Sequence, residues 1–326
     1  MTKADDSRVL RVGTRASALA LAQTTAWAHS LGLPDGGFEL VRISSEGDRS
    51  TASLASLGGT GVFVSALRDA LLAGDVDVVV HSFKDLPTAK AEGIEVVAVP
   101  PREDARDALV TAGGLGLDEL PEGAKVGTGS PRRRAQLLRQ RPDLEVVDIR
   151  GNVDTRLGRV LDQSIEPERR LDAVVLAAAG LRRLGREALV TDTLGLEHWP
   201  TAPAQGALAV EMRTEISDPV EAALREVVAR TDHRDTRLAA RIERDVLRTL
   251  EAGCAAPLGV SAAVTGDTVS VTATVYALDG SGEVTALAST HVDQADGLGA
   301  TVARDLLAGG AAELAPLGHG AGTSTS

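Results

Sequence analysis

The stretch Val76-Asp77-Val78-Val79-Val80 (residues 76–80) is a run of mainly apolar, β-branched residues, and the polar segment His81-Ser82-Phe83-Lys84-Asp85-Leu86-Pro87 follows it directly. Such a run is typical of a strand that is buried on both faces, as in sheets covered by helices on both sides. We therefore expect an α/β fold. In open α/β sheets ligands bind at the carboxyl ends of the strands, so residues 81–87 form a candidate site.

Alternating strand and helix patterns extend in both directions from this stretch. Two successive blocks rich in β-α-β units imply two parallel or mixed sheets covered by helices. In the first block we expect strands at 8–13, 38–44, 76–80 and 94–99, with helices at 16–31 and 61–72. In the second we expect strands at 108–111, 125–128, 145–149 and 173–176, with helices at 131–141 and 153–161. We expect the chain to cross between the lobes at Pro100-Pro101 and at 197–203.

The pattern changes after residue 206. A strand at 206–212 and helices at 218–230 and 234–250 precede three segments of alternating apolar and polar residues, at 260–264, 268–277 and 283–291. Turn residues separate these segments, which predicts a three-stranded antiparallel meander. A helix near 298–307 follows. The tail from Gly318 is rich in Gly, Ser and Thr, so we expect it to be disordered.

Composition excludes several classes of function. Aromatic residues make up 2% of the 326 residues, which disfavours base stacking by a single-strand binder. The formal charge of −12 argues against nucleic acid or an acidic membrane as a general partner. The N-terminus lacks the apolar core of a signal peptide, and the apolar stretch at 172–180 is too short to span a bilayer, so we expect a cytoplasmic protein. The six histidines are scattered without the spacing of metal ligands, and no metal is expected.

Four segments place polar or charged residues where a predicted strand enters a helix, a position that favours anions. Each has a plain structural alternative, such as an ordinary helix cap, a solvated basic turn or a local ion pair. Three consecutive arginines at a helix start oppose the helix dipole, and a polyanionic ligand would offset that cost. The segments are Thr14-Arg15-Ala16-Ser17, residues 81–87, Gly127-Thr128-Gly129-Ser130-Pro131-Arg132-Arg133-Arg134, and Asp148-Ile149-Arg150-Gly151-Asn152-Val153-Asp154-Thr155-Arg156.

Together these segments predict a crevice lined with Arg and Lys around one carboxylate, Asp85. Because guanidinium groups bind carboxylates in bidentate fashion, the expected ligand carries several carboxylates or phosphates. The single cysteine, Cys254, lies between a predicted helix and the meander. From its context, two interpretations stay open: a buried small hydrophobe, or an accessible sulfur that serves as nucleophile or attachment point.

In combination the motifs resemble the porphobilinogen deaminase family over residues 8–308. The matching stretches are RVGTRASALALAQT (11–24), SEGD (45–48), GTGVFVSAL (59–67), VHSFKDLPT (80–88), GTGSPRRRAQL (127–137), DIRGNVDTRL (148–157), LAAAGLRRLG (176–185), PAQGALAVE (203–211) and LEAGCAAPLG (250–259). The resemblance implies two lobes like those of periplasmic binding proteins and a small C-terminal α+β domain. It implies a first lobe at 1–103 completed by 201–219, a second lobe at 104–200, a C-terminal domain at 220–317 and a tail at 318–326.

The resemblance also implies a chemistry, hydroxymethylbilane synthesis. Members of the family join four porphobilinogen molecules head to tail, with loss of ammonia through an azafulvene-like cation, on a covalent dipyrromethane primer. Hydrolysis then releases hydroxymethylbilane for haem and other tetrapyrroles. The family implies a transferase, active as a monomer, whose product passes to a downstream synthase.

Site residues follow from the same resemblance. The cysteine that carries the primer by a thioether corresponds to Cys254, and the essential carboxylate corresponds to Asp85. Gln23 lies in a matching motif, with a structural role as its alternative. The primer contacts correspond to Ser17, Lys84, Ser130, Arg132, Arg133 and Arg156, and the substrate contacts to Arg15, Arg150, Arg156, Arg183 and Phe63, with Arg182 as the neighbour that competes for the role of Arg183.

The chain departs from the family pattern at Thr60 and Ser65, where Lys is common, at Pro131, where Leu is common, and at Ala204, where Gly is usual. None of these departures removes a proposed catalytic group. Two other classes of protein compete with the enzyme. A two-lobed anion-binding module explains the arginines but not Cys254 or Asp85, and a phosphate-handling transferase requires a metal or a general-base histidine.

Overall fold

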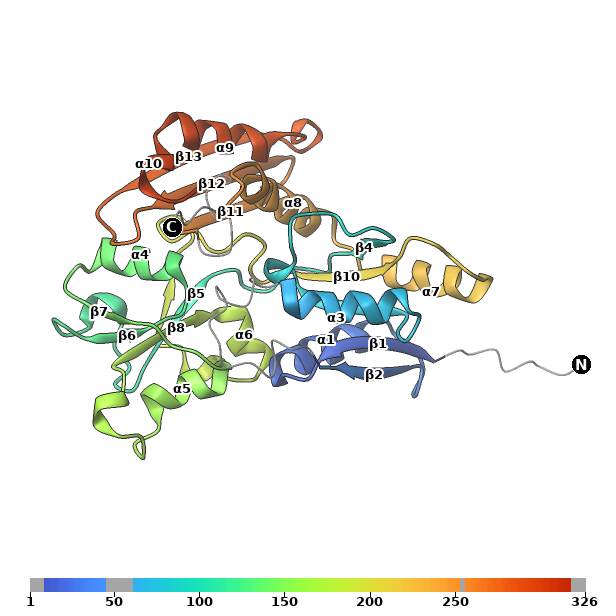
Figure 1. The fold of residues 1–326 in the computed structure, drawn as a ribbon, viewed down its shortest axis with the longest axis horizontal. Coiled ribbons are helices and arrows are strands. Elements are labelled where there is room, and N and C mark those ends of the chain that lie inside the picture. The colour runs from blue at the N-terminus through green and yellow to red at the C-terminus, as the bar shows by residue number, and fades with distance from the viewer. Residues whose placement is uncertain (1–8, 45–60, 253–255, 318–326) are drawn as a thin grey trace, which may run out of the picture. The chain divides into compact units, whose positions relative to one another are not determined.

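The computed structural model describes residues 9–44, 61–252 and 256–317, without the side chains of 61–63. Three sheets form the architecture (Figure 1), and the division into two α/β lobes and a C-terminal α+β domain is confirmed by their topology. By their internal contacts the residues group into two units, 1–102 with 207–237 and 103–206 with 238–326. The domain boundaries expected from the sequence stay a prediction.

The first lobe contains a five-stranded sheet in the order β2-β1-β3-β10-β4. Strands β1, β2 and β3 run parallel, whereas β10 is antiparallel to both of its neighbours. Side chains on β3 are almost entirely buried, as the run at 76–80 predicted. The elements are β1 (Leu10–Arg15), α1 (Ala18–Ser30), β2 (Phe38–Ile43), α3 (Gly61–Leu72), β3 (Val78–Ser82), the 3-10 helix η1 (Phe83–Asp85), β4 (Ile94–Ala98), β10 (Leu208–Arg213) and α7 (Pro219–Ala229).

The second lobe repeats this arrangement with the order β7-β6-β8-β5-β9. Strands β6, β7 and β8 are parallel, and β5 is antiparallel to β8 and β9. Each lobe therefore has one reversed strand at the fourth position of its sheet. The elements are β5 (Asp107–Thr111), η2 (Leu117–Glu119), β6 (Lys125–Gly127), α4 (Pro131–Gln140), β7 (Glu145–Val147), α5 (Val153–Leu161), η3 (Pro167–Arg169), β8 (Ala173–Ala177), α6 (Ala178–Arg183), η4 (Glu187–Leu189) and β9 (Asp192–Leu194).

The C-terminal meander has the order β11-β12-β13, antiparallel throughout. One face of this sheet packs with α8, α9 and α10 in an apolar cluster that includes Ile242, Val271 and Val302. The elements are α8 (Arg234–Thr249), β11 (Leu258–Thr265), β12 (Thr268–Tyr276), β13 (Glu283–His291), η5 (Val292–Gln294), α9 (Leu298–Ala308) and α10 (Ala311–Leu314). The tail from 318 lies outside the described residues.

Caps fix the helix starts near the predicted site. Ser17 accepts a hydrogen bond from the Ala20 N–H and begins α1, and Ser130, followed by Pro131, begins α4. Asn152 caps α5. All three caps were predicted. Several ends differ from the prediction: β1 continues to Arg15, β3 spans 78–82 instead of 76–80, and β7 stops at Val147. The short elements α6, β9 and α10 were not predicted, because segments of three to six residues carry too little periodicity.

Ala204 has a φ of 62°, in the left-handed region that favours glycine. Its N–H donates to Glu243 Oε2 at 2.6 Å, and the Glu243 side chain is fully buried. This buried carboxylate holds a backbone conformation that alanine adopts at a cost. The departure from the glycine that is usual in the family is therefore accommodated in the segment between β9 and β10.

No helix among the described residues is long and apolar enough to cross a membrane.

Candidate active site

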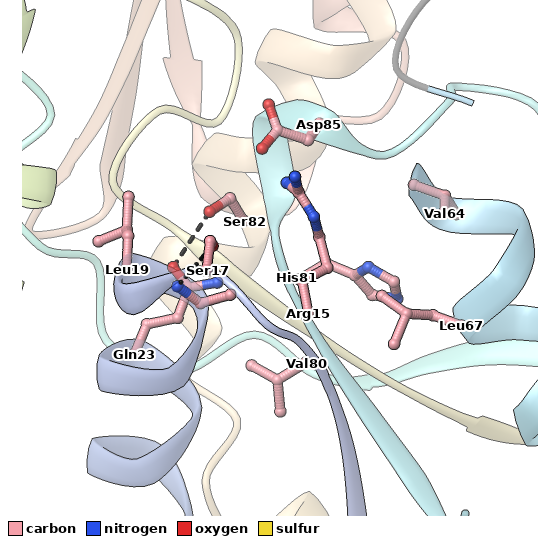
Figure 2. A pocket seen from close by; sticks show the side chains of 11 residues that line it. Arg15, Ser17, Leu19, Gln23, Val64, Leu67, Val80, His81, Ser82 and Asp85 are labelled. Atoms are coloured by element: carbon pink, nitrogen blue, oxygen red, sulfur yellow. Dashed lines mark hydrogen bonds between the residues drawn. The ribbon is translucent and has the colours of Figure 1, made fainter. Parts of the chain in front are cut away.

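A pocket in the first lobe contains three of the predicted site residues, Arg15, Ser17 and Asp85 (Figure 2). It forms where the parallel strands β1 and β3 end at the same edge of the sheet, next to the start of α1. Its other walls come from α3. The pocket is lined by Arg15, Ser17, Leu19, Ala20, Gln23, Val64, Leu67, Val80, His81, Ser82 and Asp85.

The polar side of this pocket is held by local contacts. Figure 2 shows the guanidinium of Arg15 pointing toward the carboxylate of Asp85. Ser82 Oγ donates to Gln23 Oε1 at 3.1 Å, which links β3 to α1. Asp85 itself stands at the end of η1. The arrangement presents one carboxylate and one guanidinium to a ligand, with the apolar side chains of α3 as a further wall.

In the second lobe, Arg132 and Arg133 of α4 are buried around Asp107 at the start of β5. Arg132 Nη2 lies 2.9 Å and Arg133 Nη2 lies 2.6 Å from the carboxylate, whose side chain is fully buried. Trp199 and Gln205 also donate to it, at 2.9 and 2.8 Å. Burial alone raises the pKa of Asp107, but the charges and hydrogen bonds of the two arginines hold that pKa well below its usual range.

This cluster changes the interpretation of the three-arginine run. The sequence predicted that a ligand offsets the positive charge at the start of α4. Asp107 offsets part of it, and Arg134 donates to the Val146 carbonyl at 2.7 Å. Binding of the primer by Arg132 and Arg133 stays a prediction. The signal that could have revealed Asp107 is an acidic residue that opens an otherwise apolar strand.

Arg150 and Arg156 form a second basic group in the same lobe. Arg150 is exposed and pairs with Asp148 at 3.5 Å. Arg156 is half-buried and donates to the Gly151 carbonyl at 2.9 Å. Burial lowers the pKa of Arg156, and the charges of Arg133 and Arg150 lower it further. Positive charges that repel one another in this way favour an anionic ligand.

The adjacent arginines of α6 differ in their surroundings. Arg182 is exposed and pairs with Glu103 at 2.7 Å. Arg183 is half-buried and donates to the Gly206 carbonyl at 2.7 Å, and burial lowers its pKa. Of the two, Arg183 is the more buried, and its role as a substrate contact stays a prediction.

The remaining predicted residues do not line the pocket, or their side chains are not described. Lys84 lies on η1 beside Asp85 but does not line the pocket, and Ser130 is the cap of α4. Phe63 lies in the first turn of α3, where side chains are not described. Cys254 lies outside the described residues. No group of three or more His, Cys, Asp or Glu that could hold a metal ion occurs in the described part of the chain.

His81 is a pocket residue that the sequence patterns did not single out. It begins the segment 81–87, and a lone histidine without metal-ligand spacing carries no pattern that predicts a role. Gln23, for which a structural role was the alternative, also lines the pocket.

Comparisons with known proteins identify the family. Residues 10–221 match the family model described as porphobilinogen deaminase, dipyromethane cofactor binding domain, and residues 237–308 match the porphobilinogen deaminase C-terminal domain. A porphobilinogen deaminase of Leifsonia xyli subsp. xyli is 52% identical over 94% of each chain. One of Cutibacterium acnes is 50% identical over 94% of this chain and 97% of its own.

Among solved structures, a periplasmic substrate-binding protein of an ABC transporter from Coxiella burnetii is similar with a TM-score of 0.39 and 17% identity, covering 68% of this chain and 92% of that one. The family models together span both lobes and the C-terminal domain, and the relatives match almost the whole chain. The chain belongs to the porphobilinogen deaminase family.

Proposed function

We propose that this chain is a hydroxymethylbilane synthase that joins four porphobilinogen molecules head to tail, with loss of ammonia, and hydrolyses the product from a dipyrromethane primer. This is a transferase reaction of tetrapyrrole biosynthesis. The observation that carries the proposal is the pocket of the first lobe, where Arg15, Ser17 and Asp85 from separate segments of the chain line one cavity. The carboxylate of Asp85 can pair with the ammonium group of porphobilinogen, and the guanidinium of Arg15 can pair with one of its carboxylates.

Asp85 is the proposed catalytic carboxylate. Loss of ammonia from the aminomethyl group leaves positive charge on the pyrrole ring, and a fixed carboxylate stabilises charge that develops there. Its oxygens also accept hydrogen bonds from pyrrole N–H groups, which orients the ring. The apolar side chains of Val64 and Leu67 in the wall of the pocket would limit water around a pyrrole ring bound there.

Carboxylate side chains of the substrate and of the growing product would bind the basic residues of each lobe. The proposed substrate contacts are Arg15, Arg150, Arg156, Arg183 and Phe63. The mutual repulsion of Arg133, Arg150 and Arg156 supports this assignment, because a bound carboxylate relieves it.

The residues present fit a dipyrromethane. Such a group carries several carboxylates, and the second lobe presents the half-buried Arg156 and the exposed Arg150 close enough for their charges to interact. When bound, the group supplies the free pyrrole α-position to which the substrate is joined. Cys254 would hold it by a thioether, with Ser17, Lys84, Ser130, Arg132, Arg133 and Arg156 as its polar contacts. We further propose a cytoplasmic monomer that passes its product to a downstream synthase.

Replacement of Asp85 tests this function. Asp85→Asn keeps the shape and removes the charge, so we expect turnover of porphobilinogen to fall by about 10²- to 10⁴-fold. Asp69→Asn, at an exposed position of α3 in the same lobe, is the matched control and should retain full turnover. Turnover of the Asp85 variant within threefold of the control would remove Asp85 from the mechanism.

A further inference from the structure

A buried trio of charged and titratable side chains adjoins the pocket of the first lobe. Glu211 on β10 accepts two hydrogen bonds from Arg68 of α3, at 2.6 and 3.0 Å. His81 Nε2 lies 3.2 Å from Glu211 Oε2. The side chains of His81 and Glu211 are 5% and 3% exposed. Only His81 of the three lines the pocket.

The sheet register explains how His81 and Glu211 meet. Strands β3 and β10 are antiparallel, with His81 opposite Ala209 and Val79 opposite Glu211. His81 and Glu211 are therefore diagonal neighbours on one face of the sheet. Helix α3 packs on this face, where Leu67, Leu71 and Val79 form an apolar cluster. A carboxylate in such a layer is costly unless it is fully paired, and it calls for an explanation.

A stabilising contact between α3 and the sheet explains Arg68 and Glu211 but not His81. Two guanidinium N–H groups already satisfy the carboxylate in a bidentate pair. Burial alone raises the pKa of Glu211, but the hydrogen bonds of His81 and Arg68 and the charge of Arg68 lower it. Glu211 is therefore ionised at neutral pH and is a suitable acceptor for the Nε2–H of an imidazole. Nε2 is buried and lies 3.2 Å from Glu211 Oε2, an ion-pair distance without an aligned hydrogen bond in this structure, and it makes no hydrogen bond to any other described residue.

The condensation releases a proton that a base other than Asp85 can accept. In each cycle a carbon–nitrogen bond breaks and its electron pair leaves on ammonia. A carbon–carbon bond forms, and a carbon–hydrogen bond of the acceptor pyrrole breaks so that its electron pair restores the aromatic ring. One proton is released and finally leaves with ammonia as ammonium. A carboxylate that stabilises positive charge loses this ability once it takes that proton.

We propose that His81 is the base that accepts this proton, at Nδ1, while Glu211 holds the ring through Nε2–H. The inference rests on the proposed function and adds a second catalytic group to it. A carboxylate that fixes one imidazole nitrogen sets the tautomer, leaves the lone pair on the other nitrogen, and stabilises the imidazolium that forms. The contact that His81 makes within 9–44, 61–252 and 256–317 is through Nε2, and Figure 2 shows the imidazole on the side of the pocket formed by Val64 and Leu67.

The charged groups around this imidazole come from four elements. They are Glu211 of β10, Arg68 of α3, Arg15 of β1 and Asp85 of η1. Arg15 and Asp85 line the pocket together with His81, whereas Glu211 and Arg68 pair with each other outside its lining. Because His81 itself lines the pocket, a proton that it takes from the substrate does not have to cross the sheet.

The tautomer can be measured on the unaltered protein, without turnover. We expect ¹⁵N NMR of the ring nitrogens, assigned by through-bond correlations, to show His81 with a proton on Nε2 and a lone pair on Nδ1 at the pH of the assay. A proton on Nδ1, in either the other tautomer or the imidazolium, would overturn the proposal, because Nδ1 could then accept nothing.

Kinetics of His81→Gln give the second test. Glutamine can still donate to Glu211 but cannot carry the proton, so kcat should fall by about 10²- to 10⁴-fold while KM changes by less than threefold. His29→Gln is the matched control, at an exposed histidine of α1 that contacts Phe38 edge-on. Equal turnover of the two variants, or a loss confined to KM, refutes the role of His81. If His81→Gln is active and Asp85→Asn is inactive, the role of His81 is refuted and the proposed function stands. If both variants are active, the proposed function is refuted as well.

Discussion

Asp107 offers the sharpest test of how the second lobe is held together. Its carboxylate is fully buried and accepts hydrogen bonds from Arg133, Trp199 and Gln205, with Arg132 at 2.9 Å. Asp107→Asn keeps the size of the side chain and removes its charge. Two guanidinium groups that are 3% and 6% exposed then face each other without a carboxylate.

The expected cost follows from that burial. Breaking a buried ion pair by removing one partner costs about 3–5 kcal/mol, because the remaining charge is desolvated and unpaired. Asp154→Asn is the matched control in the same lobe, since Asp154 and its partner Arg186 are each about half exposed and 3.4 Å apart. An exposed pair of this kind contributes about 0–1 kcal/mol.

The two tryptophans of the chain allow a clean assay. Trp27 lies in the first unit and Trp199 in the second. In a Trp27→Phe background, Trp199 fluorescence follows urea unfolding of the part that contains Asp107. With a slope of about 2 kcal/mol per M, the midpoint of Asp107→Asn should fall by roughly 1.5–2.5 M relative to the background. A shift no larger than that of Asp154→Asn would refute the buried-cluster account.

Two further substitutions test the electrostatics of the first lobe and the packing of the second. The pKa of Glu211 is lowered from 4.5 to about 2 although burial alone raises it, so its contribution to stability is complete above pH 4.5 and is lost as the pH falls toward 2. Glu211→Gln should flatten that acid limb of the urea midpoint, and an unchanged limb would contradict the assignment. Gly127→Ala places a Cβ 2.5 Å from a leucine methyl and should cost about 1–3 kcal/mol, whereas Gly158→Ala in α5 meets nothing within 4 Å and should raise the midpoint.

Periodicity predicted the long elements well, because an amphipathic helix or a buried strand repeats its signal over many residues. It did not reveal that β5 and β10 run antiparallel to their neighbours. Strand direction depends on contacts between segments far apart in the chain, such as Val210 with Val80. The family resemblance supplied the two-lobed plan that periodicity alone left open.

The candidate site was predictable where residues stand at strand ends. Arg15, Ser17 and Asp85 meet in one pocket because β1 and β3 end at the same edge. A single acidic residue in an apolar strand, such as Asp107 or Glu211, indicates a buried charge but does not say which cation pairs with it. The prediction for Arg132 and Arg133 was incomplete because the carboxylate that they share, Asp107, lies 26 residues before Arg133 in the sequence.

The intact mass of the purified protein, measured beside Cys254→Ser, tests the proposed function most directly. We predict an excess over the sequence mass equal to two linked pyrroles, present on the unaltered chain after incubation with porphobilinogen and absent from the variant. No adduct on the unaltered chain after that incubation, or the same adduct on Cys254→Ser, would contradict the covalent primer and its attachment at Cys254.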